Sequence, residues 1–131
     1  MTALDTNVLV RIVVNDDEQQ VHRAHAFLAA QDRVLISRTV LLELGWVLAG
    51  SRYQLSRATI ASSIRTLSNI PNVEIEDRNS VMFAIDCYEQ GMDFADAMHL
   101  ASVHGESEFA TFDVALRRTA QRLGIARVIS I

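Results

Sequence analysis

Short apolar runs alternate with helical segments along the whole chain. The runs at 3–4, 34–36, 73–75, 109–112 and 128–131 are too short for helices, and several are rich in β-branched or aromatic residues. Each of the first four is followed by segments whose apolar residues recur at helical spacing. Strands that alternate with helices form parallel sheets, because a parallel connection must cross back over the sheet. We therefore expect an α/β fold with a five-stranded parallel sheet sandwiched between helices.

Polar residues and glycines predict where individual helices begin and end. Asp5 precedes the first helix, and Asp113 precedes the last. Gly91 stops the helix at 79–90 in a left-handed conformation, and a short helix at 93–104 follows. In the helix that Asp16 and Asp17 can cap, the spacing places four apolar residues on an inner face: Val21, Ala24, Phe27 and Leu28.

The length and composition favour one packed domain over residues 1–131. Half of the 131 residues are hydrophobic, which is enough to bury a core. The single cysteine, Cys87, excludes an internal disulfide and a zinc site built on several thiolates. The longest apolar stretches, 8–14 and 40–48, are too short to span a bilayer, and no secretory signal is visible. We expect a cytoplasmic protein that does not insert into a membrane.

All twelve basic residues are arginines, and the chain has no lysine. This excludes a Walker-A phosphate loop, which requires a lysine, and Schiff-base catalysis. The formal net charge of −4 disfavours broad nucleic-acid binding through a basic surface, although a local arginine face could still contact a phosphate backbone.

Four carboxylates lie among apolar neighbours: Asp5, Glu43, Asp96 and Asp113. Buried charges are costly unless they are paired or bind a metal. Asp5 and Asp113 follow strands, and ligands of open parallel sheets gather beyond the carboxyl ends of strands. If all four side chains face one crevice, Mg²⁺ or Mn²⁺ is the natural counter-charge. Each also has a structural interpretation: Asp5 and Asp113 as N-caps, Glu43 as the partner of an arginine or as part of an exposed patch of its helix, and Asp96 as a first-turn acid.

The motifs Leu4-Asp5-Thr6-Asn7-Val8-Leu9, Glu43 within a helix, Phe94-Ala95-Asp96-Ala97 and Thr111-Phe112-Asp113 occur in this order. This pattern resembles the PIN-domain family, and within it the VapC-type toxins of toxin–antitoxin pairs. By position, Asp5, Glu43, Asp96 and Asp113 match the acidic quartet of the family, and Asn7 and Thr111 match polar positions that orient a ligand or water. Asp93 is an extra acid whose role stays open, with an N-cap favoured over a ligand.

The resemblance implies a Mg²⁺- or Mn²⁺-dependent endoribonuclease, with a metal-activated water and no Ser, Cys or His nucleophile. It also implies a homodimer and a small antitoxin partner, and single-stranded or looped RNA is the favoured substrate. Trp46 and Tyr53 offer apolar surface for an antitoxin helix, whereas Val47 and Leu48 are better explained as core. The arginines close to the motifs are candidates for RNA contact: Arg11, Arg38, Arg52 and Arg117.

Two rival functions stay open, a small metal-dependent phosphohydrolase and a non-catalytic PIN-like binding module. A ribonuclease built on a histidine pair is disfavoured. His22 and His25 share a helix face that is better explained as solvated, and His99 as packed. His104 precedes Gly105 at a helix end, where a cation suits the helix dipole.

Overall fold

The computed structural model describes residues 1–103 and 105–131. These residues form two compact units, Met1–Arg78 and Asn79–Ile131, and each is described by itself. The interpretation of His104 as a helix-end cation lies outside the described residues. No helix in the described ranges combines the length and the apolar character needed to cross a bilayer.

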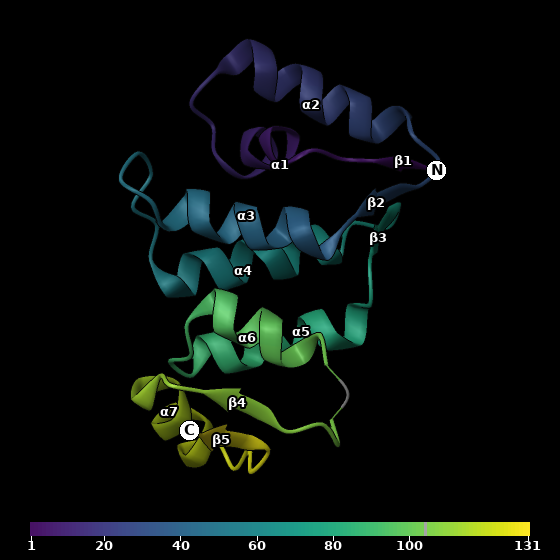
Figure 1. Cartoon of the computed structure of the whole chain (residues 1–131). Coiled ribbons are helices and arrows are strands. Elements are labelled where there is room, and N and C mark those ends of the chain that lie inside the picture. The colour runs from purple at the N-terminus through teal and green to yellow at the C-terminus, as the bar shows by residue number, and fades with distance from the viewer. Residues whose placement is uncertain (104) are drawn as a thin grey trace. The chain divides into compact units, whose positions relative to one another are not determined.

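The first unit contains a parallel sheet of three strands with helices between them (Figure 1). Its elements are β1 (Thr2–Ala3), α1 (Thr6–Val13), α2 (Glu18–Ala30), β2 (Val34–Ile36), α3 (Arg38–Ala49), α4 (Arg57–Ser68) and β3 (Val73–Ile75). Strand β2 is central, pairing Thr2 with Val34 on one side and Ile36 with Ile75 on the other. Sequential strands therefore lie in neighbouring positions, as the alternating pattern predicts.

Capping side chains set the helix starts in this unit. The side chains of Asp5, Asp17, Ser37 and Ser56 each accept a hydrogen bond from a backbone N–H in the first turn of α1, α2, α3 and α4. These N–H groups have no partner within their helix, so each cap satisfies a donor that would otherwise be unpaired. The predicted N-cap role of Asp5 is therefore observed.

Helices α1, α3 and α4 bury the core of the first unit. Fully buried side chains include Leu9, Leu41, Leu44, Leu48 and Ile60. The expectation that Leu48 is core is confirmed, whereas Val47 is half-buried and Trp46 is 79% exposed.

The predicted inner face of α2 is only partly correct. Ala24 and Leu28 are buried, but Phe27 is 43% exposed. Ala24 and Leu28 are four residues apart and stand above one another, whereas Phe27 is rotated by one residue to the edge of that face.

Among its described residues, the second unit contains a two-stranded parallel sheet and three helices. Its elements are α5 (Arg78–Glu89, which begins at the end of the first unit), α6 (Phe94–Ala101), β4 (Phe109–Thr111), α7 (Val114–Arg122) and β5 (Val128–Ser130). Phe109 pairs with Val128, and Thr111 pairs with Ser130. Gly91 has a φ of +114°, as its predicted left-handed role requires. Helix α6 ends at Ala101, before the end predicted for it.

The α/β class with parallel strands is confirmed, but the prediction of one five-stranded sheet is wrong. Among the described residues, the hydrogen-bonded ladders comprise three strands in one sheet and two in another. Strand β1 has only two residues, and its ladder is formed with β2. Apolar runs predict that strands exist, whereas pairing requires backbone groups to be aligned, and a two-residue strand offers few of them.

Candidate functional site

Three residues of the first unit form what we call the first carboxylate cluster: Asp5, Thr6 and Glu43. The Asp5 carboxylate accepts a hydrogen bond through Oδ1 from the Thr6 backbone N–H at 2.8 Å. The Thr6 hydroxyl donates to Oε1 of Glu43, which lies 37 residues further along on α3. Thr6 therefore joins the start of α1 to the middle of α3 and brings the two predicted site carboxylates together.

Thr6 is the residue that sequence reasoning missed. It is 4% exposed, and a buried hydroxyl requires a hydrogen-bond partner. The sequence signal was its position between Asp5 and Asn7 at the start of an otherwise apolar helix. Its partner could not be identified from the sequence, because the contact depends on how α1 and α3 pack.

Asp5 and Asn7 also border a pocket of about 520 Å³ within the first unit. The pocket lies along β1, α1 and α2, and both side chains are exposed. The structure therefore connects the first carboxylate cluster to a cavity large enough for part of a ligand.

Three acids of the second unit form the second carboxylate cluster: Asp93, Asp96 and Asp113. Asp93 is the N-cap of α6 and accepts from the Asp96 backbone N–H at 3.1 Å, so its predicted capping role is confirmed. Asp113 caps α7 by accepting from the Leu116 N–H at 3.1 Å. Thr111 accepts from the Asp113 backbone N–H at 2.9 Å, which fixes the turn that carries this acid.

The pKa of Asp96 is raised above its ordinary value. Partial burial of the carboxylate is the largest cause, followed by repulsion from Asp93 and Asp113, while His99 acts in the opposite direction. Asp96 also lies in the first turn of α6, where the helix dipole favours a negative charge. Burial and the two neighbouring acids therefore disfavour the charged form of Asp96, and the cluster has an excess of negative charge.

Each of the four predicted site carboxylates retains an oxygen that forms no hydrogen bond with the described residues. Asp5 and Asp113 use only Oδ1 for capping, and Glu43 uses only Oε1. The backbone N–H of Asp96 donates a hydrogen bond to Asp93, but the Asp96 side chain accepts no hydrogen bond within the described ranges. N-cap and ligand interpretations are therefore compatible, because capping occupies one oxygen and leaves the other available.

The four predicted site acids are less buried than their apolar neighbours in the sequence suggested. Apolar neighbours in sequence suggested buried charges, yet Asp5, Glu43 and Asp113 are exposed and only Asp96 is half-buried. A helix residue can have apolar neighbours three and four residues away in the sequence, yet its side chain is exposed to solvent when it lies at the edge of the buried face of the helix.

The chain matches the model of a known protein family. The PIN-domain model matches residues 2–122. The chain belongs to the PIN-domain family. No curated protein and no solved structure matches it in the corresponding comparisons. PIN domains are generally metal-dependent nucleases, so membership indicates nuclease chemistry.

In the described part of this PIN domain, no group of three or more His, Cys, Asp or Glu side chains is gathered closely enough to hold a metal ion by itself. The donor set still fits a hard divalent cation, because the free atoms of both clusters are carboxylate oxygens. The assignment of the four acids as metal ligands stays a prediction.

Most arginines predicted to contact RNA are already engaged. Arg11 and Arg52 form ion pairs with Asp16 at 2.7 Å and 3.2 Å, and Arg38 pairs with Glu76 at 3.2 Å. The Tyr53 hydroxyl also donates to Asp16 and is the largest cause of its lowered pKa. Asp16 therefore joins the loops that follow α1 and α3.

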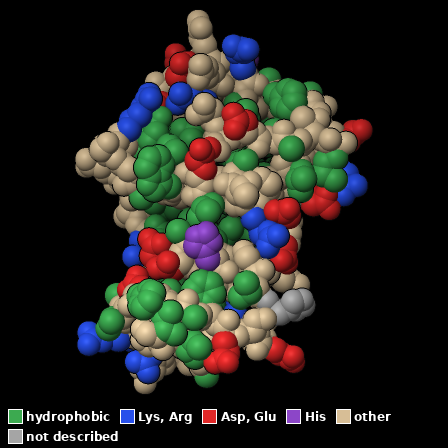
Figure 2. All heavy atoms as spheres, viewed as in Figure 1, with side chains coloured by type: hydrophobic (Ala, Val, Ile, Leu, Met, Phe, Trp, Pro, Cys, Tyr) green, Lys and Arg blue, Asp and Glu red, His purple; other side chains and the backbone are tan. Residues whose placement is uncertain are grey.

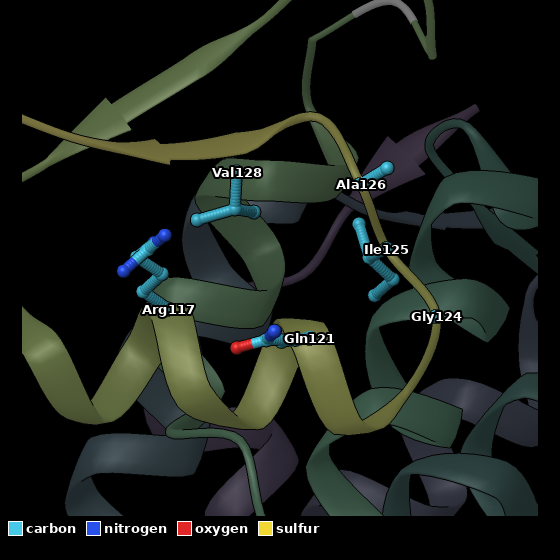
Figure 3. Close-up of a pocket in the computed structure, with 6 residues that line it drawn as sticks. All are labelled: Arg117, Gln121, Gly124, Ile125, Ala126 and Val128. Atoms are coloured by element: carbon cyan, nitrogen blue, oxygen red, sulfur yellow. The ribbon is translucent and has the colours of Figure 1, made fainter.

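Arg117, the fourth of these arginines, is exposed and lines a separate pocket of about 320 Å³ in the second unit. Figure 3 shows Arg117 and Gln121 on one face of α7, directed toward Val128. The lining residues of this pocket include none of the predicted site residues. We therefore do not assign the chemistry of the PIN domain to it.

The raised pKa of Asp96 predicts how stability depends on pH in the metal-free protein. The folded state holds the Asp96 proton more tightly than the unfolded state, so this stabilisation is complete below the ordinary pKa of 3.8 and is lost as pH rises through the folded pKa. In EDTA at neutral pH, we expect Asp96→Asn to melt at a higher temperature than the wild type. Thermal melts from acid to neutral pH measure the difference, which should grow with pH.

Asp32→Asn is the matched control for this substitution, because Asp32 is exposed in the loop before β2. It should melt like the wild type at every pH. If Asp96→Asn melts below the wild type throughout the range, the carboxylate is stabilising and its interpretation as a repelled charge is wrong.

Proposed function

We propose that this PIN domain is a metal-dependent endoribonuclease and the toxin of a toxin–antitoxin pair. The observation that carries the nuclease proposal is the set of available carboxylate oxygens at Asp5, Glu43, Asp96 and Asp113, in a chain whose family consists generally of metal-dependent nucleases. That both clusters serve one site rests on the family resemblance.

The four carboxylates would hold Mg²⁺ or Mn²⁺. When bound, such a cation lowers the pKa of a coordinated water and offsets charge on phosphoryl oxygens. The residues of this chain orient the ligands: Thr6 holds one oxygen of Glu43, and Thr111 holds the backbone of Asp113. Asn7, exposed beside Asp5 at the edge of the pocket, would orient a substrate phosphate or a water.

The direct test is cleavage of single-stranded RNA in Mg²⁺, in EDTA, and in EDTA followed by excess Mg²⁺. We expect cleavage only where free Mg²⁺ is present, with internal cuts in a circular RNA. Hydrolysis of a phosphate monoester without RNA cleavage would favour a phosphohydrolase. RNA binding without cleavage in either Mg²⁺ or Mn²⁺ would favour a non-catalytic binding module.

Thr6 is predicted to act through Glu43 as a positioning residue. Thr6→Val keeps the shape of the side chain but removes the hydroxyl donor, and we expect a loss of about 10- to 100-fold in kcat, comparable to losing a hydrogen bond that orients a metal ligand. The free energy of unfolding should fall by about 1.5–3 kcal/mol, as for a lost hydrogen bond to a charged group. Cleavage rates and denaturant melts measure the two effects.

Thr6→Ser is the matched control because it retains the hydroxyl. A purely structural role predicts that kcat follows the folded fraction, whereas a positioning role predicts reduced kcat in fully folded Thr6→Val and recovery in Thr6→Ser. Equal kcat values for fully folded wild type and Thr6→Val would contradict the positioning role.

The toxin assignment rests on the VapC-like order of the motifs over the chain. Trp46, which is 79% exposed on α3, supports a docking surface for an antitoxin helix. The homodimer is part of the same proposal. Analytical ultracentrifugation of the toxin, alone and with the product of a neighbouring short reading frame, measures both associations.

A further inference from the structure

We propose that the pocket along β1, α1 and α2 binds one nucleotide of the RNA strand, with its phosphate at Arg23 and its base against Phe27. This inference rests on the proposed ribonuclease function and names the subsite next to its first carboxylate cluster. Arg23 and Phe27 were not among the residues predicted to contact RNA.

The pocket is lined by chemically different groups from separate elements. Asp5 and Asn7 come from the start of α1, and four other lining residues come from α2. Gln20, Arg23, Ala24 and Phe27 recur at three- and four-residue spacing and therefore form one face of α2. The volume of about 520 Å³ lies within the range of small-ligand sites and is suited to a nucleotide.

Arg23 supplies a cation that the fold does not use. The other arginine in the lining, Arg11, is held by Asp16 at 2.7 Å and Gln20 at 2.6 Å. Arg23 is exposed and forms no hydrogen bond or ion pair with the described residues. A guanidinium with free donors matches the geometry of a phosphate group.

Phe27 supplies an aromatic surface in the same cavity. Its side chain is 43% exposed although the neighbouring Ala24 and Leu28 on α2 are buried. Single-stranded nucleic acids bind by stacking bases on such rings while cations contact the backbone. The apolar lining beside Phe27, which includes Leu4, Val8 and Ala24, suits the faces of a base.

The proposed subsite lies in the same pocket as Asp5 and Asn7, so a nucleotide bound there is next to the first carboxylate cluster. A nucleotide held at Arg23 and Phe27 would have the adjoining stretch of its strand beside Asp5, where the proposed chemistry occurs. Figure 2 shows arginine side chains, in blue, beside acidic side chains, in red, on the viewed face. A local contact of this kind explains how an acidic chain with a net charge of −4 can hold RNA.

The test is binding of a short, fluorescently labelled single-stranded RNA, measured by anisotropy in EDTA so that cleavage does not interfere. Phe27→Ala should weaken binding about tenfold without changing its salt dependence, as for a lost stacking contact. Arg23→Gln should weaken binding and lower the slope of log K against log salt by about 0.7, as for one lost phosphate contact on a single strand. Phe27→Tyr should bind like the wild type, because it keeps the ring.

Two controls match these changes at other surfaces. Phe83 on α5 is 38% exposed, and Phe83→Ala removes a similar ring; Arg118 on α7 is exposed, and Arg118→Gln removes the same charge. Both should bind RNA like the wild type. Equal losses in the controls, or no loss in Phe27→Ala and Arg23→Gln, would overturn the subsite.

Measuring both RNA binding and RNA cleavage distinguishes a failure of the subsite from a failure of the proposed nuclease function. If the wild type cleaves RNA but the pocket variants bind normally, the subsite is wrong and the nuclease stands. If the wild type binds RNA through Arg23 and Phe27 yet never cleaves it, the subsite stands and the nuclease is wrong. Failure of the wild type to bind RNA, with the pocket binding a peptide instead, would overturn the subsite.

Discussion

Replacing Asp5 or Asp96 with asparagine is expected to reduce metal-dependent RNA cleavage at least a hundredfold, roughly the upper limit seen for losing residues that only support metal ligands. Each substitution keeps the size of the side chain and removes the charge of a carboxylate that has a free oxygen. Glu43→Gln and Asp113→Asn should have similar effects. Single-turnover cleavage of labelled RNA with enzyme in excess measures the residual rates, and circular dichroism checks the fold.

Combining Asp5→Asn with Asp96→Asn tests whether the two carboxylate clusters serve one reaction. Groups that act as a unit have strongly non-additive effects, so the double variant should be about as slow as the slower single variant. Independent sites predict that the two losses multiply. Asp32→Asn and Glu108→Gln, two exposed acids outside both clusters, should cleave at the wild-type rate. Near-normal activity of either single variant would contradict the assignment of that residue.

The elements of this fold could be predicted from the sequence because they depend on local physics. Capping at Asp5, Asp17 and Asp113 requires only a short acceptor side chain before a helix, and the left-handed residue Gly91 requires only the absence of a Cβ. The pairing of strands could not be predicted in the same way. It depends on which backbone groups align, and a five-strand pattern is compatible with one ladder or with two.

The candidate site was predictable in its residue types but not in its contacts. The order of the acidic motifs identified the family, which the PIN-domain match confirms. The Thr6–Glu43 hydrogen bond joins residues 37 apart in the chain, and the Asp16–Tyr53 bond likewise joins residues 37 apart. Such contacts depend on how helices pack, so sequence spacing alone left Thr6 unassigned and gave no partner for Asp16.

Inducing the wild-type protein alone in a bacterial host is expected to arrest growth, because a toxin ribonuclease without its antitoxin cleaves cellular RNA. Asp5→Asn should leave growth normal at the same protein level, since an asparagine at this position can still accept the Thr6 N–H bond through its amide oxygen while the charge is lost. Colony counts and culture density after induction measure the effect, and immunoblots confirm equal amounts of the two proteins. Phe83→Ala, which alters an exposed side chain on α5, is a control that should remain toxic.

Normal growth with folded wild-type protein that cleaves RNA in vitro would contradict the toxin role and leave the nuclease in place. Arrest by both wild type and Asp5→Asn would show that toxicity does not depend on this carboxylate, and the link between growth arrest and RNA cleavage would then be wrong.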